Sequence, residues 1–247
     1  MFKDLLKLDL YPTSWCPGCG IGQIAIQLAM TMDELGLDHT NSTLVSGVGC
    51  TARMPEYFNM DGTYTLHGRT LPFAEAVKIV NPDLNVIVVS GDGDLASIGG
   101  NHLVHVSRRN ANLAVICNSN QVYGLTGGQA GPTTPKGTKT TSTPVGSPYE
   151  PVNIQGLMRA NASYFYARTT IYHQAHLRKC IKEAIAWPGF AFVDLVCNCI
   201  ENNGRRLGFA SAYEMLQYYR STYKQAPEGT DVLEPFQIGI IKKDSSA

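Results

Sequence analysis

The sequence predicts an α/β protein with a doubly wound, mostly parallel sheet. Short β-branched runs alternate along the 247 residues with segments of helical pattern. The predicted strands are apolar almost throughout, which is typical of strands buried on both faces of a parallel sheet. We expect strands at 43–46, 85–90, 113–118 and 191–196, and helices near 20–35, 72–80, 97–108, 173–186 and 211–224.

The composition is that of an ordinary globular protein, with 44% hydrophobic and 16% charged residues. The 20 basic and 20 acidic side chains balance, and no run of Lys or Arg stands out, which argues against nucleic acid as a partner. The first residues lack the apolar core of a signal peptide, and no apolar run approaches the ~20 residues of a membrane span. We therefore expect a cytoplasmic protein. Seven cysteines in such a chain favour metal ligands and buried thiols over disulfides.

The first chemical motif, Cys16-Pro17-Gly18-Cys19, precedes the first predicted helix. Its Pro and Gly allow a turn tight enough to aim both sulfurs at one metal. Zinc, an iron–sulfur cluster and thiol redox chemistry would all suit such a pair. Cys50 and Cys199 each follow a predicted strand, so three segments bring thiols to one edge of the sheet, as a [4Fe–4S] cluster requires. Cys117, in a strand, and Cys180, on a helix, are expected to be buried.

A second motif, Gly91-Asp92-Gly93, directly follows the strand 85–90, and Asn120 follows the strand 113–118. Neighbouring parallel strands would deliver a carboxylate and an amide oxygen to the same edge, and Mg²⁺ prefers such hard oxygen ligands. The glycines let backbone approach a phosphate, and the next helix points its N-terminus at this edge. Gly-Asp-Gly alone is also an ordinary turn. With the strand–loop–helix–strand interval before Asn120 it resembles the thiamine-diphosphate motif, which implies a diphosphate site.

Two segments depart from the alternation of strands and helices. The interval 124–150 is rich in Gly, Pro and Thr, which is typical of a linker, but a long loop after a strand is often functional. The tail 227–247 has no clear helix or strand. We expect an α/β domain over 1–226 and a tail that docks on a neighbouring subunit.

Six motifs occur in a characteristic order over residues 11–206. They are Cys16-Pro17-Gly18-Cys19-Gly20, Gly47-Val48-Gly49-Cys50, His67-Gly68-Arg69, Gly91-Asp92-Gly93-Asp94, Gly99-Gly100-Asn101-His102 and Tyr123-Gly124-Leu125-Thr126-Gly127-Gly128-Gln129. In this order they resemble the β subunit of 2-oxoacid:ferredoxin oxidoreductases. The resemblance implies a thiamine-diphosphate-binding fold and a CoA-dependent oxidative decarboxylation that passes electrons from a 2-oxoacid to ferredoxin.

The resemblance also implies the cofactor ligands. In the family's thiamine-diphosphate motif, Mg²⁺ is held by positions that match Asp92, Asn120 and the Val122 carbonyl. The surrounding motif residues would contact the cofactor, namely Gly91, Gly93, Asp94, Tyr123, Gly124, Leu125 and Thr126. Here the usual Asn-Asn pair reads Ser119-Asn120, which leaves the ligand intact.

In the family four cysteines bind one [4Fe–4S] cluster, and three of them match Cys16, Cys19 and Cys50. We choose Cys199 as the fourth over Cys197, because a family cysteine is followed five residues later by Gly-Arg-Arg, as Cys199 is. Ile200 stands where the family usually has Pro, and Gly131 replaces a common Ser, so local shape differs there. The segment that begins at Cys197 ends in Gly204-Arg205-Arg206. This ending is more similar to the 2-oxoglutarate branch of the family than to its pyruvate branch.

Catalytic roles carry over at two positions. Arg53 matches a family cation near the substrate carboxylate, which a guanidinium can bind with two bonds, although a surface arginine is the alternative. His67 would lie near the cofactor or at a partner interface.

In the family, the glutamate that activates the aminopyrimidine of the cofactor lies on another domain. The resemblance therefore implies a separate α subunit and an αβ hetero-oligomer. Pyruvate, a branched-chain or an aryl 2-oxoacid as substrate, a non-redox thiamine-dependent decarboxylase component and a zinc-stabilised binding module remain alternatives.

Overall fold

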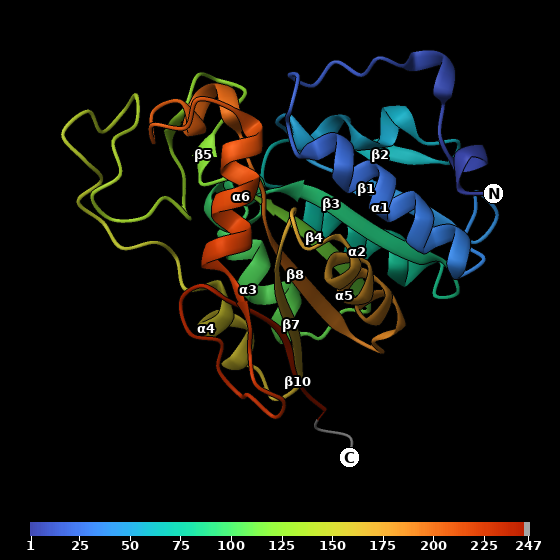
Figure 1. Cartoon of the computed structure of the whole chain (residues 1–247). Coiled ribbons are helices and arrows are strands. Elements are labelled where there is room, and N and C mark those ends of the chain that lie inside the picture. The colour runs from blue at the N-terminus through green and yellow to red at the C-terminus, as the bar shows by residue number, and fades with distance from the viewer. Residues whose placement is uncertain (245–247) are drawn as a thin grey trace.

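The computed structural model describes residues 1–244, which form an α/β fold around one eight-stranded sheet. The strand order is β2-β1-β3-β4-β8-β7-β10-β9 (Figure 1). Neighbouring strands are parallel except β10, which runs antiparallel to β7. The predicted mostly parallel sheet is thus confirmed. The strands are β1 (Ser42–Ser46), β2 (Gly62–Tyr64), β3 (Asn85–Gly91), β4 (Leu113–Ser119), β7 (Tyr164–Thr170), β8 (Phe190–Val196), β9 (Lys224–Gln225) and β10 (Gln237–Lys243).

Helices cover both faces of the sheet. One layer is α1 (Ile21–Glu34) and α5 (Gln174–Ala186), which lie toward the viewer in Figure 1; the other is α2 (Thr70–Val80), α3 (Gly100–Arg108) and α4 (Ile154–Arg159). The helix α6 (Ala212–Thr222) begins where the Ser211 side chain accepts a hydrogen bond from the backbone of Glu214. None of the helices in residues 1–244 is long and apolar enough to cross a membrane.

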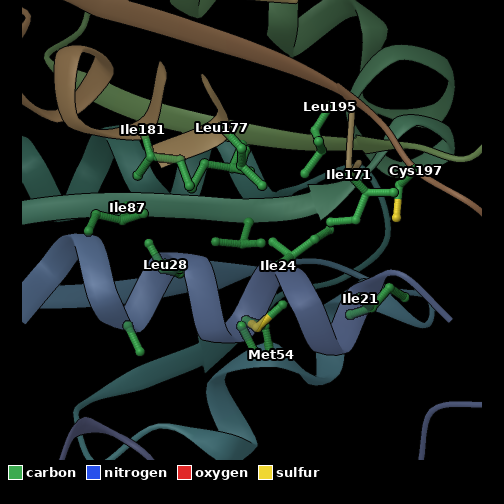
Figure 2. Packing of buried hydrophobic residues seen from close by; sticks show 14 of the residues in the cluster. Ile21, Ile24, Leu28, Met54, Ile87, Ile171, Leu177, Ile181, Leu195 and Cys197 are labelled. Atoms are coloured by element: carbon green, nitrogen blue, oxygen red, sulfur yellow. The ribbon is translucent and has the colours of Figure 1, made fainter. Parts of the chain in front are cut away.

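The strands divide their side chains between the two layers because successive residues point to opposite faces. In β3, Ile87 and Val89 pack with α1 and α5, whereas Val86 and Val88 pack with α2 and α3. Figure 2 shows Ile87 facing Leu28 of α1. Both faces of the central strands are therefore buried, which explains their continuous hydrophobicity.

All the predicted strands and helices are present, with small shifts at their ends. The largest shift is at the helix predicted over 97–108, where α3 begins only at Gly100 and is preceded by a π-helical turn over Gly93–Ile98. Cys117 and Cys180 are buried, as predicted.

The prediction of a tail without regular structure is wrong within the described residues. The strand β10 pairs with β7 over five residues and buries Ile238 and Ile241 against the sheet. This part of the tail therefore belongs to the α/β domain and does not form a free arm.

The interval 124–150 is a structured loop and not a linker. It contains β6 (Gln129–Ala130), which forms a hairpin with β5 (Val122–Tyr123). Further along, Gly137 N donates to the Ser147 carbonyl at 2.8 Å, and Ser147 N donates to Thr138 at 2.9 Å. In Figure 1 this loop extends to the left, away from the sheet.

Candidate functional site

The candidate site is built by loops at the carboxyl edge of the sheet. These loops follow β2, β1, β3, β4 and β8, which are consecutive in the sheet order, so distant segments of the sequence converge there. The Cys16–Gly20 loop before α1 joins them. Ligands of open α/β sheets bind at this edge.

Asp92 follows β3 directly and is buried, with 2% of its surface exposed. Burial raises the pKa of its carboxyl to about 7, and the nearby Asp194 carboxylate adds to this rise. A hydrogen bond from Thr133 Oγ1 and the Gly93 backbone amide oppose it. A buried carboxylate with so few donors is poorly compensated, which fits a ligand to a cation.

The chain turns sharply between the two other predicted magnesium ligands, Asn120 and Val122. Gln121 lies in the left-handed region with φ 68°, which is uncommon for a residue other than glycine. Thr134 Oγ1 donates to the Gln121 carbonyl, and Val122 N donates to Asn120 Oδ1 at 3.2 Å. Such strained turns cluster at ligand sites.

These residues line a cavity of about 100 Å³, here called the diphosphate cavity. A Cβ on Gly93 would lie 2.3 Å from Tyr123 Cε1, so only glycine lets Tyr123 close over this backbone. The cavity brings together nearly all the predicted cofactor residues: His67, Gly91, Asp92, Gly93, Asp94, Asn120, Val122, Tyr123, Gly124, Leu125 and Thr126.

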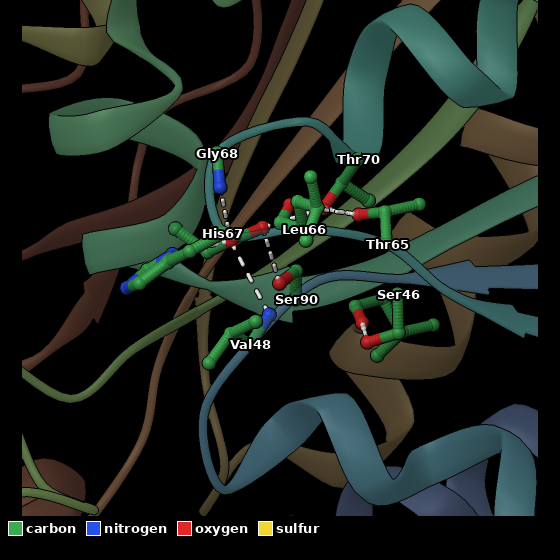
Figure 3. A network of polar contacts seen from close by, with 10 residues as sticks. Ser46, Val48, Thr65, Leu66, His67, Gly68, Thr70 and Ser90 are labelled. Atoms are coloured by element: carbon green, nitrogen blue, oxygen red, sulfur yellow. Dashed lines mark hydrogen bonds and ion pairs between the residues drawn. The ribbon is translucent and has the colours of Figure 1, made fainter.

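Asp94 lines the diphosphate cavity, but protein donors surround both of its carboxylate oxygens. The donors come from the loops after β1 and β2, from β3 and from α2, so Asp94 holds these elements together. They are Val48 N at 3.3 Å, His67 Nδ1 at 2.7 Å, Gly68 N at 2.7 Å, Thr70 Oγ1 at 2.5 Å and Ser90 Oγ at 2.9 Å (Figure 3).

Two further residues lie directly against Asp94, and one of them, His67, also lines this cavity. His67 Nδ1 is hydrogen-bonded to Asp94. The His67 ring lies edge-on to the Tyr123 ring, with 6.4 Å between the two ring centroids. At Gly47 a Cβ would lie 2.0 Å from Asp94 Oδ2, so only glycine fits this loop against the carboxylate.

The four predicted cluster ligands, Cys16, Cys19, Cys50 and Cys199, line a second cavity of about 230 Å³, here called the cysteine cavity. Burial, with smaller contributions from the Cys199, Cys50 and Cys16 thiols, raises the pKa of Cys19 to about 12, which is the effect expected of four like groups close together. Trp15 Nε1 donates to the Cys50 carbonyl at 2.8 Å and fixes one wall.

Four thiols from three segments surround one cavity, and four thiolates are the usual ligands of a [4Fe–4S] cluster. No group of three or more His, Cys, Asp or Glu side chains in residues 1–244 is placed to hold a single metal ion. A cluster makes a different demand, because each of its thiolates binds a different iron atom. Cys197, in contrast, is 2% exposed, packs in the core beside α1 and does not line this cavity.

The two cavities adjoin each other: Cys50, Asn120, Gly124 and Leu125 line both. A Cβ on Gly124 would lie 3.4 Å from Cys199 Sγ and 3.7 Å from Asn120 Nδ2. A predicted cluster ligand and a predicted magnesium ligand therefore flank the same glycine.

Two asparagines in the π-helical turn Ile200–Gly204 lock the loop of Cys199 onto the loop of Asn120. Asn202 Nδ2 donates to the Gly124 carbonyl at 2.7 Å, and Asn203 Nδ2 donates to the Asn120 carbonyl at 2.9 Å. We call this pair the asparagine clamp. Sequence reasoning missed it, as it missed Thr133, because nothing local indicates the distant partner; adjacency to Cys199 was the available signal.

Arg53, the predicted cation, and Arg69 of the His67-Gly68-Arg69 motif lie in different places. Arg53 is exposed, lines the cysteine cavity and donates from Nη1 to Ser14 Oγ at 3.3 Å. Arg69 lines neither cavity and pairs with His102 at 2.5 Å. Arg53 is thus the cation available to an anionic group that enters the cysteine cavity.

A model of the family described as "Thiamine pyrophosphate enzyme, C-terminal TPP binding domain" matches residues 42–195. Among curated proteins, the 2-oxoglutarate synthase subunit KorB of Methanothermobacter marburgensis is 40% identical over 219 residues, which cover 89% of this chain and 77% of the relative. The protein of the same name from Archaeoglobus fulgidus is 35% identical over 244 residues, which cover 98% and 89%.

Among solved structures, the 2-oxoglutarate:ferredoxin oxidoreductase from Magnetococcus marinus, with 2-oxoglutarate, coenzyme A and succinyl-CoA bound, superposes with a TM-score of 0.88. The two chains are 32% identical, and the match covers 100% of this chain and 86% of the other. A thiamine diphosphate-dependent 4-hydroxybenzoylformate decarboxylase from Rhodococcus jostii, at 17% identity and a TM-score of 0.52, shares the fold alone; the match covers 77% of this chain and 34% of the other.

Proposed function

Because the chain belongs to the thiamine-diphosphate-binding β subunits of 2-oxoacid:ferredoxin oxidoreductases, we propose that it serves an enzyme that oxidises 2-oxoglutarate with coenzyme A to succinyl-CoA and carbon dioxide. The two electrons released go to ferredoxin. The observation that carries this proposal is the shared wall between the diphosphate and cysteine cavities. A redox decarboxylase needs both sites side by side, whereas a non-redox thiamine enzyme needs no cysteine cavity.

Mg²⁺ would be held by the Asp92 carboxylate, the Asn120 amide oxygen and the Val122 carbonyl. The pKa of Asp92, raised by burial, supports this role, since a divalent cation compensates a buried carboxylate. Bound thiamine diphosphate supplies the carbanion-stabilising chemistry of the decarboxylation. The chain's own part is to hold the diphosphate against the Gly91–Gly93 backbone and to exclude water with Tyr123.

The cluster would be held by Cys16, Cys19, Cys50 and Cys199. The burial of Cys197 outside the cysteine cavity supports Cys199 as the fourth ligand. The asparagine clamp keeps the Cys199 loop against the Asn120 loop, so the distance that electrons cross between the two sites stays fixed.

Arg53 would bind a carboxylate of the 2-oxoacid, because it is an exposed cation that lines the cysteine cavity, which adjoins the diphosphate cavity. His67 would contact the cofactor from the diphosphate cavity, held in orientation by Asp94. 2-Oxoglutarate carries a second carboxylate that pyruvate lacks, so Arg53 would favour 2-oxoglutarate by binding that second carboxylate.

The partners would be an α subunit and ferredoxin in an αβ hetero-oligomer. Apolar side chains stand exposed on the loops that form the diphosphate cavity, which supports a subunit covering it. They are Val48 (42% exposed), Leu66 (80%), Ile98 (54%) and Leu125 (56%). All seven cysteines are free thiols, which supports the reducing cytoplasm as the compartment.

The substrate is tested by purifying the chain anaerobically with its α subunit and measuring ferredoxin reduction on a panel of 2-oxoacids with coenzyme A. We expect the highest kcat/KM on 2-oxoglutarate, and Arg53→Gln should lower it by about tenfold or more through KM. A preference for pyruvate, a branched-chain or an aryl 2-oxoacid would overturn the substrate assignment and leave the reaction type intact.

The ligand set is tested by iron and sulfide analysis of cysteine variants in the same complex. Cys16→Ser, Cys19→Ser, Cys50→Ser and Cys199→Ser should each lose the cluster, because serine keeps the size of the side chain and removes the thiolate. Cys197→Ser is the matched control and should keep full iron. Loss of iron in the Cys197 variant together with full iron in the Cys199 variant would reverse the choice of the fourth ligand.

A further inference from the structure

One buried side chain on the wall of the cysteine cavity is incompletely paired. Asn118, near the end of β4, is 0% exposed, and its Nδ2 donates to Thr51 Oγ1 at 2.7 Å. Its Oδ1 is buried without a hydrogen-bond partner among the described residues 1–244. Buried polar atoms are nearly always paired, so an unpaired one indicates a partner that the chain itself does not provide.

The position of Asn118 identifies where that partner lies. Asn118 lines the cysteine cavity together with the four predicted cluster ligands. In the sheet it pairs with Gly91 of β3 and with Leu195 of β8, the strands whose loops carry Asp92 and Cys199. Its partner Thr51 directly follows Cys50. Asn118 is therefore buried against the cysteine cavity, and its partner Thr51 lines the diphosphate cavity.

The carboxamide can offer the cavity either an acceptor or a donor. A half-turn about its Cβ–Cγ bond exchanges oxygen and NH₂, which are similar in size. The Thr51 hydroxyl can donate as well as accept, so its bond to Asn118 survives the exchange. Four ionised thiolates and the sulfides of a cluster are anionic, and they attract the donor end of the amide.

We propose that Asn118 donates a hydrogen bond from its amide to a sulfur of the iron–sulfur cluster and so raises the reduction potential of that cluster. This rests on the cluster proposed above. A donor beside the sulfur stabilises the reduced state, which carries one more negative charge. Asn118 thus acts through the cluster. Its hydrogen bond makes the cluster a better acceptor for electrons from the adjoining diphosphate cavity.

The test uses the anaerobic αβ complex and a redox titration followed by the EPR signal of the reduced cluster. Asn118→Leu replaces the amide by an apolar group of similar size, and we expect full iron content with a midpoint potential shifted to more negative values. Asn85→Leu is the matched control, because Asn85 lies at the opposite end of β3 and donates to the Asn41 carbonyl at 2.9 Å. It should leave the potential unchanged.

A second readout reports the hydrogen bond directly. After exchange into D₂O, pulsed EPR of the wild-type complex should detect deuterons coupled to the reduced cluster, and one of these couplings should be missing in Asn118→Leu. If that variant does not fold, Asn118→Ser takes its place, since its shorter side chain cannot reach the cluster, and the same shift and loss are expected.

The outcomes separate this inference from the function on which it rests. A fully loaded variant with the wild-type potential and all couplings overturns the role of Asn118 and leaves the cluster in place. A wild-type complex without iron overturns the cluster itself, and with it this inference.

Discussion

Asp92 and Asp94 are two residues apart and both buried, yet their surroundings differ in what compensates the charge. Asp94 is surrounded by five protein donors, whereas Asp92 accepts one side-chain hydrogen bond, from Thr133. The first arrangement stabilises the fold, and the second leaves a carboxylate in need of a cation. The sequence motif Gly-Asp-Gly-Asp could not separate these roles, because the donors come from distant loops.

This difference predicts that replacement by asparagine affects cofactor binding at Asp92 and stability at Asp94. Asp92→Asn should lower the affinity for thiamine diphosphate and Mg²⁺ by more than about tenfold and leave thermal stability unchanged or higher, because it removes a poorly compensated buried charge. Asp94→Asn should lower the free energy of unfolding by about 3 kcal/mol, because it breaks a satisfied buried network. Calorimetry of binding and of unfolding measures both, and a reversal of the two results would refute the assignment.

His176, far from the candidate site, gives a prediction on pH. Burial lowers its pKa from 6.5 to about 4, and its Nδ1 lies 3.0 Å from Thr169 Oγ1. The unfolded chain therefore binds a proton at a higher pH than the folded chain does. This contribution to stability is present above about pH 6.5 and is lost as the pH falls toward 4.

The measurement is denaturant unfolding of the isolated chain at several pH values between 7 and 4. His176→Gln, which cannot titrate, should show a shallower loss of stability over this range than the wild-type chain. Parallel curves for the two proteins would mean that His176 does not control the acid sensitivity.

At the scale of elements, the sequence predicted the strands whose hydrophobicity is continuous and missed those that carry polar residues. The strand β7 contains Arg168 and two threonines, and it lies inside the sheet between β8 and β10, where Arg168 pairs with Asp194 of β8 at 3.6 Å. The strand β10 ends in Lys242 and Lys243, which are exposed at the end of its pairing with β7. Both depend on tertiary partners that a single-sequence pattern does not contain.

The asparagine clamp joins two loops, so its loss should affect both cofactor sites together. Asn202→Ala with Asn203→Ala removes two side-chain donors to the loop that carries Asn120. We expect retention of iron and of thiamine diphosphate to fall together, because the Cys199 and Asn120 loops lose their fixed spacing.

Asn153→Ala is the matched control for the clamp. It also removes one asparagine bond to backbone, from Gly156 N at 2.8 Å, but at the start of α4. It should cost stability only, by about 1 kcal/mol. Loss of iron with full retention of thiamine diphosphate in the double variant would contradict a coupling of the two sites.

At the scale of the molecule, the edge of the sheet that holds both cavities was predictable because parallel strands end together. Four strands, two motifs and four cysteines were enough to place Asp92, Asn120 and Cys199 near one another. The interlocking of the two sites through Gly124, Asn202 and Asn203 was not predictable, since it depends on side chains that meet only in the folded chain.

The exposed apolar side chains on the loops of the diphosphate cavity predict that this chain works only in a complex. Purified alone, it should fold but should not reduce viologen dyes with 2-oxoglutarate and coenzyme A. Addition of the α subunit should restore the activity. Substantial turnover by the isolated chain would contradict a divided active site.

The central claim is that electrons released in the diphosphate cavity enter a cluster in the adjoining cysteine cavity of the same chain. EPR of the oxidised αβ complex, frozen anaerobically after addition of 2-oxoglutarate and coenzyme A without ferredoxin, tests it most directly. We predict the signal of a reduced [4Fe–4S] cluster in the wild-type complex and no such signal in the complex with Cys199→Ser. Turnover without any reduced cluster signal in the wild type, or the same signal in the Cys199 variant, would contradict the claim.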